Sequence, residues 1–139
     1  MLSSQLKLSL SYYSDLYDMI VPKDHILRKI RELVDFSFIY DELKNKYCLD
    51  NGRNAKNPIL LFKYLLLKYL YNLSDNGVVE RSRYDMSFKY FLELTPEEEV
   101  IHPRACLKNK SYTKHKSYYC LLILKISKIN IIYIIIDIF

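Results

Sequence analysis

The residues of this sequence whose types and spacing could bind a ligand are cations that lie beside the expected starts of helices. Arg53 and Lys56 come directly before an apolar segment that begins with Asn57 and Pro58. The N-terminus of a helix is electropositive because its first N–H groups have no partner in the helix, so two cations beside it form a plausible seat for a phosphate group. The other interpretation is a loop with ordinary surface charges, and the pattern leaves both open.

A second group of cations follows the turn at residues 74–77. In a helix-turn-helix unit the second or third helix would enter a major groove and direct basic and hydroxyl side chains at bases and phosphates. The candidates for such contacts are Arg81, Arg83, Ser87 and Lys89. Glu80 and Asp85 lie beside the arginines, so intramolecular ion pairs are the alternative, and such pairs would argue against contact with DNA.

The acidic residues and the histidine at position 25 give little support to catalysis. Glu97, Glu98 and Glu99 are adjacent, and acids at a helix start are what the helix dipole favours. Two-metal chemistry requires acids that converge from separate elements. His25 has no second metal-binding residue one helical turn later, which favours a capping or packing role. We therefore expect no catalytic residue, no metal site, no cofactor and no small-molecule substrate.

The elements that position these residues are predicted to be helices. Asn57 is a good N-cap, Pro58 suits the first helical position, and nearly every residue from Ile59 to Leu73 is apolar, which predicts a central buried helix. Ser74 or Asp75 then caps a second helix over residues 78–84. A third starts at residue 85 or 87 and ends near residue 94, which completes a helix-turn-helix-like unit.

Further helices are predicted on both sides of this unit. Asp24 caps a helix that ends near Leu33, and Asp35 begins another that ends near Lys46. The first includes or adjoins four cations that lie largely off its apolar stripe and form either a solvated face or a phosphate-contacting face: Lys23, Arg28, Lys29 and Arg31. A capping box at residues 95–98 predicts one more helical turn. With only two Gly and four Pro in 139 residues, the fold class is all-α.

The charge of the chain is unevenly distributed. The formal charge of +5 divides into −1 for residues 1–103 and +6 for residues 104–139. Overall charge is therefore no evidence that the folded part binds DNA. The three cysteines, at positions 48, 106 and 120, are widely spaced and form no C-x-x-C pair, as is typical of a reduced cytoplasmic protein.

Six sequence pieces in a fixed order indicate a family. They are V-P-K-D-H-I-L-R-K-I (21–30), V-D-F-S-F-I (34–39), Y-C-L-D-N-G-R-N-A (47–55), N-P-I-L-L-F-K-Y-L-L-L (57–67), L-S-D-N-G-V-V-E-R (73–81) and F-K-Y-F-L-E-L-T-P (88–96). Over about residues 19–103 the chain resembles the N-terminal domain of DDE-type bacterial insertion-sequence transposases. The resemblance implies recognition of transposon-end DNA, the terminal inverted repeats, and a role in pairing subunits.

The resemblance stops after Pro103, where similar transposases continue towards a catalytic domain. We expect a truncated, catalytically inactive fragment with a loosely attached arm (1–20), a helical domain (21–103) and an Ile/Lys-rich, frameshift-derived tail (104–139). One alternative is a helical interaction module that dimerises through exposed Tyr and Leu side chains without binding DNA. Another is a small membrane-associated protein held by residues 121–139. For this segment, the free energy gained by inserting its apolar side chains into a membrane nearly equals the free energy lost by inserting its charged ones.

Overall fold

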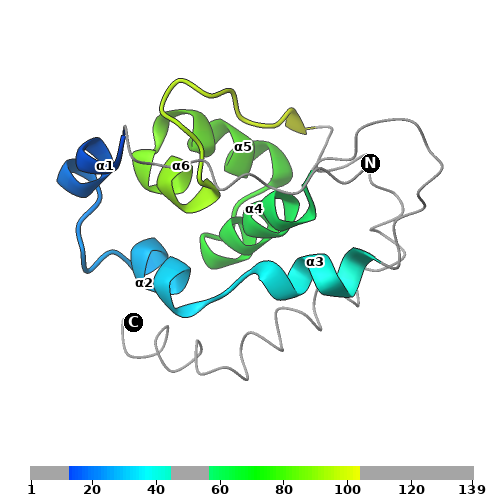
Figure 1. Ribbon diagram of the computed structural model, residues 1–139. Helices are drawn as coiled ribbons and strands as arrows, with labels where there is room; N and C mark the ends of the chain where they lie inside the picture. The colour runs from blue at the N-terminus through cyan, green and yellow to red at the C-terminus, as the bar shows by residue number, and fades with distance from the viewer. Residues whose placement is uncertain (1–12, 45–56, 104–139) are drawn as a thin grey trace.

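The computed structural model describes residues 13–44 and 57–103. Within these two ranges the chain forms six α-helices and no strand (Figure 1). The helices are α1 (Ser14–Ile20), α2 (Ile26–Leu33), α3 (Ser37–Lys44), α4 (Pro58–Leu70), α5 (Asp75–Tyr84) and α6 (Met86–Leu92). The all-α fold class predicted from the sequence is confirmed. The predicted tail, residues 104–139, lies outside the described residues.

Helix α4 forms the centre of the domain, as its apolar sequence predicts. The Asn57 side chain accepts a hydrogen bond of 2.9 Å from the Ile59 N–H, and Pro58 occupies the first turn. Figure 1 shows α4 between α3 on one side and α5 and α6 on the other, and α4 contacts all three. It ends at Leu70, three residues before the predicted end, because Asn72 adopts a left-handed conformation (φ 50°) that turns the chain away.

The hydrophobic core joins α4 to every neighbouring helix. Phe36 packs edge-on against Phe91 with ring centroids 5.9 Å apart, and it also tilts against Phe62 at 6.3 Å. Aromatic pairs in these arrangements add to the free energy gained by burying their surface. The fully buried members of the core include Leu27, Ile30, Ile39, Phe62, Leu67, Val78, Val79, Phe88 and Phe91.

Helices α5 and α6 follow α4 through short connections, four residues before α5 and one residue, Asp85, before α6. The Ser74 hydroxyl oxygen accepts from the Gly77 N–H at 3.0 Å and caps α5. Asp85 ends α5 and caps α6 at the same time, since its carboxylate accepts from the Ser87 N–H at 2.9 Å. Helix α6 ends where Glu93 adopts a left-handed conformation (φ 59°). The order α4, α5, α6 is the three-helix arrangement that the sequence predicts.

Helix α1 is part of the packed domain, so the expectation of a loosely attached segment is wrong for residues 14–20. Tyr17 is 1% exposed, and its hydroxyl donates a hydrogen bond of 2.5 Å to the carbonyl oxygen of Leu94. Its ring lies edge-on to Tyr90 of α6, 5.6 Å away. One aromatic side chain therefore fastens α1 both to α6 and to the segment that follows it. Residues 1–12 lie outside the described residues.

Arg28 connects α1 to α2. This role is neither of the two expected for the basic residues of this segment, a solvated face or a phosphate-contacting face. Its guanidinium is 2.7 Å from the Asp18 carboxylate and donates to the Val21 carbonyl at 2.8 Å. Arg28 and Arg31 both lie over the ring of Tyr90, at 4.7 and 4.5 Å from its centroid. These two cations are thus engaged within the domain.

The predicted N-cap of α2 is shifted by one residue. His25, and not Asp24, caps this helix, because the imidazole Nδ1 accepts from the Leu27 N–H at 3.2 Å. This confirms the capping role expected for His25. Helix α3 begins at Ser37, whose N–H donates to the Asp35 carboxylate at 3.0 Å, in agreement with the predicted start.

The capping box predicted at residues 95–98 is present and forms a single turn, which does not extend into a longer helix. The Glu98 N–H donates to the Thr95 carbonyl at 3.1 Å, and the Glu98 carboxylate accepts from the Thr95 N–H at 3.3 Å. The carbonyl oxygens of Pro96 and Glu98 accept from the Lys89 ammonium at 2.6 and 3.1 Å. A helix would direct those carbonyls at its own next turn, so their bonds to Lys89 favour an irregular segment.

Candidate nucleic-acid interface

Arg81 lies on the exposed side of α5 but is engaged within the chain. Its Nε is 3.1 Å from Oδ2 of Asp85, and its guanidinium carbon is 4.7 Å from the ring centroids of both Tyr71 and Phe88. Burial alone would raise the pKa of Asp85, but hydrogen bonds from Ser87 and Arg81 outweigh it and hold that pKa below its usual value. Asp85 is therefore ionised at neutral pH and remains a partner for Arg81.

Arg83, the second candidate, pairs with Glu80 one turn earlier on α5. Its Nη1 is 3.3 Å from Oε2 of Glu80, and both side chains are largely exposed, at 48% and 60%. Exposed pairs of this kind contribute only about 0.3–0.5 kcal/mol, so a phosphate group could displace Glu80 at little cost. The intramolecular ion pairs considered from the sequence are thus present on α5, and Arg83 is the more easily released of the two arginines.

Lys89 is placed differently from the surface cation expected at this position. Its side chain is buried, with 6% of the residue exposed. The ammonium donates to the carbonyl oxygens of Pro96 and Glu98 and so holds the segment after α6 against that helix. The reason is geometric: on α6 Lys89 follows Phe88 and precedes Phe91, both core residues, and the chain after Leu94 returns across it.

Arg53 and Lys56 lie outside the described residues. The element that they precede is described, and α4 begins with the Asn57 cap directly after Lys56. The start of this helix is electropositive, as it is for any helix of comparable length. The proposed phosphate seat before α4 therefore stays a prediction.

The distribution of charge separates the described helices from the rest of the chain. Residues 13–44 and 57–103 hold ten Lys and Arg against fourteen Asp and Glu, a formal charge of −4. Residues 45–56 have a net charge of +2, and residues 104–139 have +6. Six cations within the described ranges form ion pairs with acids: Arg28, Arg31, Lys63, Lys68, Arg81 and Arg83. The described helices thus offer few uncommitted positive charges to a polyanion.

Lys63 is a buried cation whose role the apolar pattern of α4 did not reveal. Its side chain is 3% exposed, and its Nζ is 3.3 Å from Oε1 of Glu93, an oxygen that also lies 3.4 Å from Nε of Arg31. Burial lowers the pKa of Lys63, and the neighbouring Glu93 opposes that shift. Helix α4 contains a second lysine, Lys68, whose side chain is 31% exposed, so the sequence alone does not indicate which of the two is buried.

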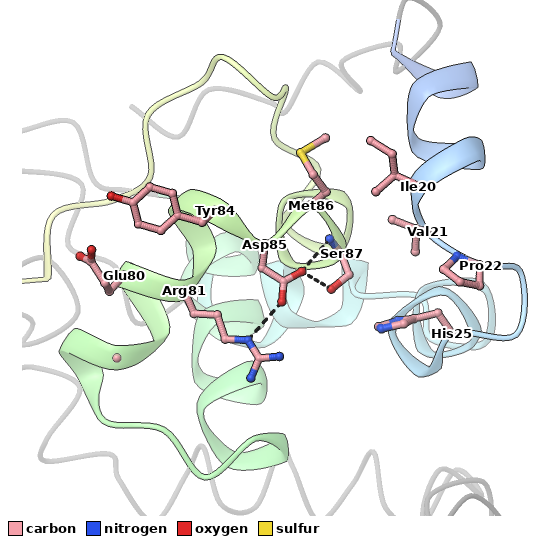
Figure 2. A pocket seen from close by; sticks show the side chains of 11 residues that line it. Ile20, Val21, Pro22, His25, Glu80, Arg81, Tyr84, Asp85, Met86 and Ser87 are labelled. Atoms are coloured by element: carbon pink, nitrogen blue, oxygen red, sulfur yellow. Dashed lines mark hydrogen bonds and ion pairs between the residues drawn. The ribbon is translucent and has the colours of Figure 1, made fainter.

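An open groove lies between the start of α2 and the junction of α5 with α6 (Figure 2). Its volume is about 840 Å³. One wall is formed by Ile20, Val21, Pro22 and His25, and the other by Gly77, Glu80, Arg81, Tyr84, Asp85, Met86 and Ser87. Its two walls come from segments more than fifty residues apart, so no local pattern in the sequence indicates this groove.

The described residues contain neither a metal-binding group nor a helix that could span a membrane. Among residues 13–44 and 57–103 there is no group of three or more His, Cys, Asp or Glu side chains arranged to hold a metal ion. In the same part of the chain, no helix has the length and apolar character needed to cross a bilayer. Residues 121–139, for which a membrane role was considered, lie outside it.

The helices packed around α4, with the continuous unit from α4 to α6, define a small all-helical domain. The family model of the transposase domain (DUF772) matches residues 15–111, more than half of the chain, and the chain belongs to this family. The resemblance to the N-terminal region of insertion-sequence transposases is thereby confirmed. No curated protein and no solved structure matches the chain.

Proposed function

We propose that this domain recognises the terminal inverted repeats of a transposon and contributes binding, without itself supplying the chemistry of strand transfer. The observation that supports the proposal most directly is membership of the transposase domain family. Three acids in and beside the helices α5 and α6 form ion pairs: Asp75 pairs with Lys68, Asp85 with Arg81 and Glu93 with Lys63. Acids committed to cations and helix caps are poorly suited to holding two catalytic metal ions.

The charge distribution favours Arg53 and Lys56 as the first phosphate contacts. The segment that contains them has a net positive charge, whereas the described helices are acidic overall. Arg83 and Arg81 would join the contact by exchanging Glu80 and Asp85 for phosphate oxygens. Lys89 would act indirectly, because it holds the segment after α6 in place.

The test is a mobility-shift titration of the full chain with a duplex of the element's terminal repeat and with a scrambled duplex, at several salt concentrations. We expect tighter binding to the repeat and a steep fall in affinity with salt. The double variant Arg53→Ala, Lys56→Ala should weaken binding to both duplexes and reduce the salt slope by about 2, because each lost phosphate contact removes roughly 0.9.

Lys68→Ala is the matched control, since Lys68 is a partly exposed cation in the last turn of α4, at the opposite end of that helix from Lys56. It should leave both the affinity and the salt slope within error of the wild type. Equal affinity of the wild type for the repeat and the scrambled duplex would exclude specific recognition. An unchanged salt slope in the double variant would exclude the phosphate seat before α4.

A further inference from the structure

The groove between the start of α2 and the α5–α6 junction contains a guanidinium group that is held in place. The guanidinium carbon of Arg81 is 4.7 Å from the ring centroids of both Tyr71 and Phe88. Its Nε is 3.1 Å from Oδ2 of Asp85. The two rings and the carboxylate together restrict the guanidinium, although 44% of the Arg81 side chain is exposed. A side chain that is restricted before a ligand arrives loses less conformational entropy on binding it.

Most of the hydrogen-bond donors of Arg81 are uncommitted. A guanidinium has five N–H donors. In the described part of the chain, Nε is the only one of its nitrogen atoms with a hydrogen-bond partner. The two Nη atoms remain, and their parallel N–H groups match the spacing of the two oxygen atoms of a carboxylate. Because Arg81 lines the groove, this pair of donors is accessible to a ligand there.

The opposite wall supplies another donor. Nδ1 of His25 accepts a hydrogen bond from the Leu27 N–H at 3.2 Å, so the neutral imidazole carries its proton on Nε2. His25 lines the groove together with Arg81. Figure 2 shows the guanidinium of Arg81 and the ring of His25 directed from opposite walls into the same space. Donors from two walls thus face one space, which suits an acceptor with two oxygen atoms.

The rest of the lining indicates what kind of acceptor fits. The charges of the two lining acids are balanced, because Asp85 pairs with Arg81 and Glu80 pairs with Arg83. A polyanion requires a positive excess, whereas a single carboxylate requires only local donors. The apolar lining residues are Ile20, Val21, Pro22, Tyr84 and Met86. A ligand that fills the groove therefore needs an apolar group beside its carboxylate.

We infer that the groove binds a monocarboxylate that carries a compact apolar group. The carboxylate accepts from the Nη atoms of Arg81 and from Nε2 of His25, and the apolar group lies against Ile20, Pro22 and Met86. Sites for small ligands have this composition, mostly apolar walls with a few converging polar groups. A free organic acid and the last residue of a peptide share this chemistry. The inference goes beyond the proposed function, since it requires no DNA.

The first experiment titrates the isotope-labelled full chain with N-acetyl-phenylalanine and follows the amide and Arg81 Nε signals by NMR. We expect saturable shifts at the groove, with a dissociation constant on the order of 1 mM. N-acetyl-phenylalanine amide keeps the apolar group without the charge, and acetate keeps the charge without the apolar group. Each should bind about tenfold more weakly or worse, because each lacks one of the two contacts.

Phenylpropionate identifies the source of the ligand, because it has the carboxylate and the ring but no peptide group. An affinity equal to that of N-acetyl-phenylalanine supports a free organic acid as the ligand. A clearly lower affinity supports the end of a peptide, whose backbone then contributes to binding. Either result requires the carboxylate and the apolar group together.

The second experiment assigns the contacts by substitution. Arg81→Lys keeps a positive charge beside Asp85 but removes the paired Nη donors, so it should weaken the binding of N-acetyl-phenylalanine about tenfold. Arg83→Lys is the matched control, because the Arg83 side chain is 48% exposed on the same helix and does not line the groove. It should leave the affinity unchanged. His25→Asn keeps an acceptor that can cap α2 but removes Nε2, and it should weaken binding roughly threefold or more.

Four outcomes would overturn the inference. The first is the absence of saturable shifts at the groove, and the second is an amide that binds as tightly as the acid. The third is an Arg81→Lys variant with the affinity of the wild type, once far-UV circular dichroism has shown that it is folded. The fourth is inorganic phosphate that binds as tightly as N-acetyl-phenylalanine, because the apolar walls would then contribute nothing. These titrations contain no DNA, so their result is independent of the test of terminal-repeat recognition.

Discussion

Removing one oxygen atom from Tyr17 tests whether α1 belongs to the folded domain. In Tyr17→Phe the ring keeps its edge-on contact with Tyr90, but the carbonyl oxygen of Leu94 loses the hydroxyl that donates to it at 2.5 Å. Tyr17 is 1% exposed, so water cannot readily replace that donor. We expect the free energy of unfolding to fall by about 1–2 kcal/mol, the cost of leaving a buried acceptor without a partner. For a domain of this size the melting temperature would fall by roughly 5–15 °C.

The measurement is urea unfolding followed by far-UV circular dichroism at pH 8. Tyr13→Phe is the matched control, because the Tyr13 hydroxyl donates to the Glu97 carboxylate at 3.1 Å in an exposed bond between the same two segments. Its loss should change the free energy of unfolding by less than about 0.5 kcal/mol. A Tyr17→Phe protein as stable as the wild type would refute the attachment of α1 to the segment after α6.

The same pair of proteins gives a distinctive alkaline response. Burial, reinforced by the carboxylate of Glu98, raises the pKa of Tyr17 to about 12. An unfolded tyrosine ionises near pH 10, so the folded state holds the proton more tightly. The stability from the neutral phenol is fully present below about pH 10 and is lost as the pH rises towards 12. The advantage of the wild type over Tyr17→Phe should therefore shrink in that window, and a constant difference would contradict the burial of the phenol.

Three other substitutions test the remaining polar contacts. Lys63→Met should change the free energy of unfolding little at neutral pH. In the wild type this free energy should rise with pH between the lowered pKa of Lys63 and its unfolded value near 10.4, because the unfolded state binds more protons there, and Lys63→Met should remove that rise. Urea titrations from pH 7 to 10 would measure the difference. Lys89→Met should lower the free energy of unfolding by about 1–3 kcal/mol without changing the salt slope of DNA binding. Asp85→Ala should lower the free energy of unfolding by about 1 kcal/mol at pH 7, because α6 loses its N-cap. The difference between wild type and variant should shrink as the pH falls through the lowered pKa of Asp85 and the wild-type carboxylate is protonated.

The helices of this domain could be predicted from local chemistry with few errors. Asn57, Ser74 and Asp85 cap α4, α5 and α6 as their side chains and positions suggest. Capping depends on neighbours two or three residues away, so a sequence contains most of the information that determines it. The errors arise where a distant residue decides. The position of Lys89 is one example, because the carbonyl oxygens of Pro96 and Glu98 accept from its ammonium and hold it inside the domain.

The surface was harder to predict than the helices. Whether Arg28 faces solvent depends on α1, whose packing follows from the contact of Tyr17 with a residue 77 positions later. The groove could not be predicted at all, because it forms between two segments that the sequence does not relate. The alternative of internal ion pairs on α5, by contrast, was visible in the sequence, since Glu80 and Asp85 stand at helical spacing from Arg83 and Arg81.

The double role of Asp85 fixes the number of residues between two helices. Because the same residue closes α5 through its backbone N–H and opens α6 through its carboxylate, the junction contains no spare position that could absorb an insertion. One added residue would rotate α6 by roughly 100° about its axis. That rotation would carry Phe88 and Phe91 out of the core and bring polar side chains in. Relatives with this architecture are therefore expected to vary here in the identity of residues and to conserve their spacing.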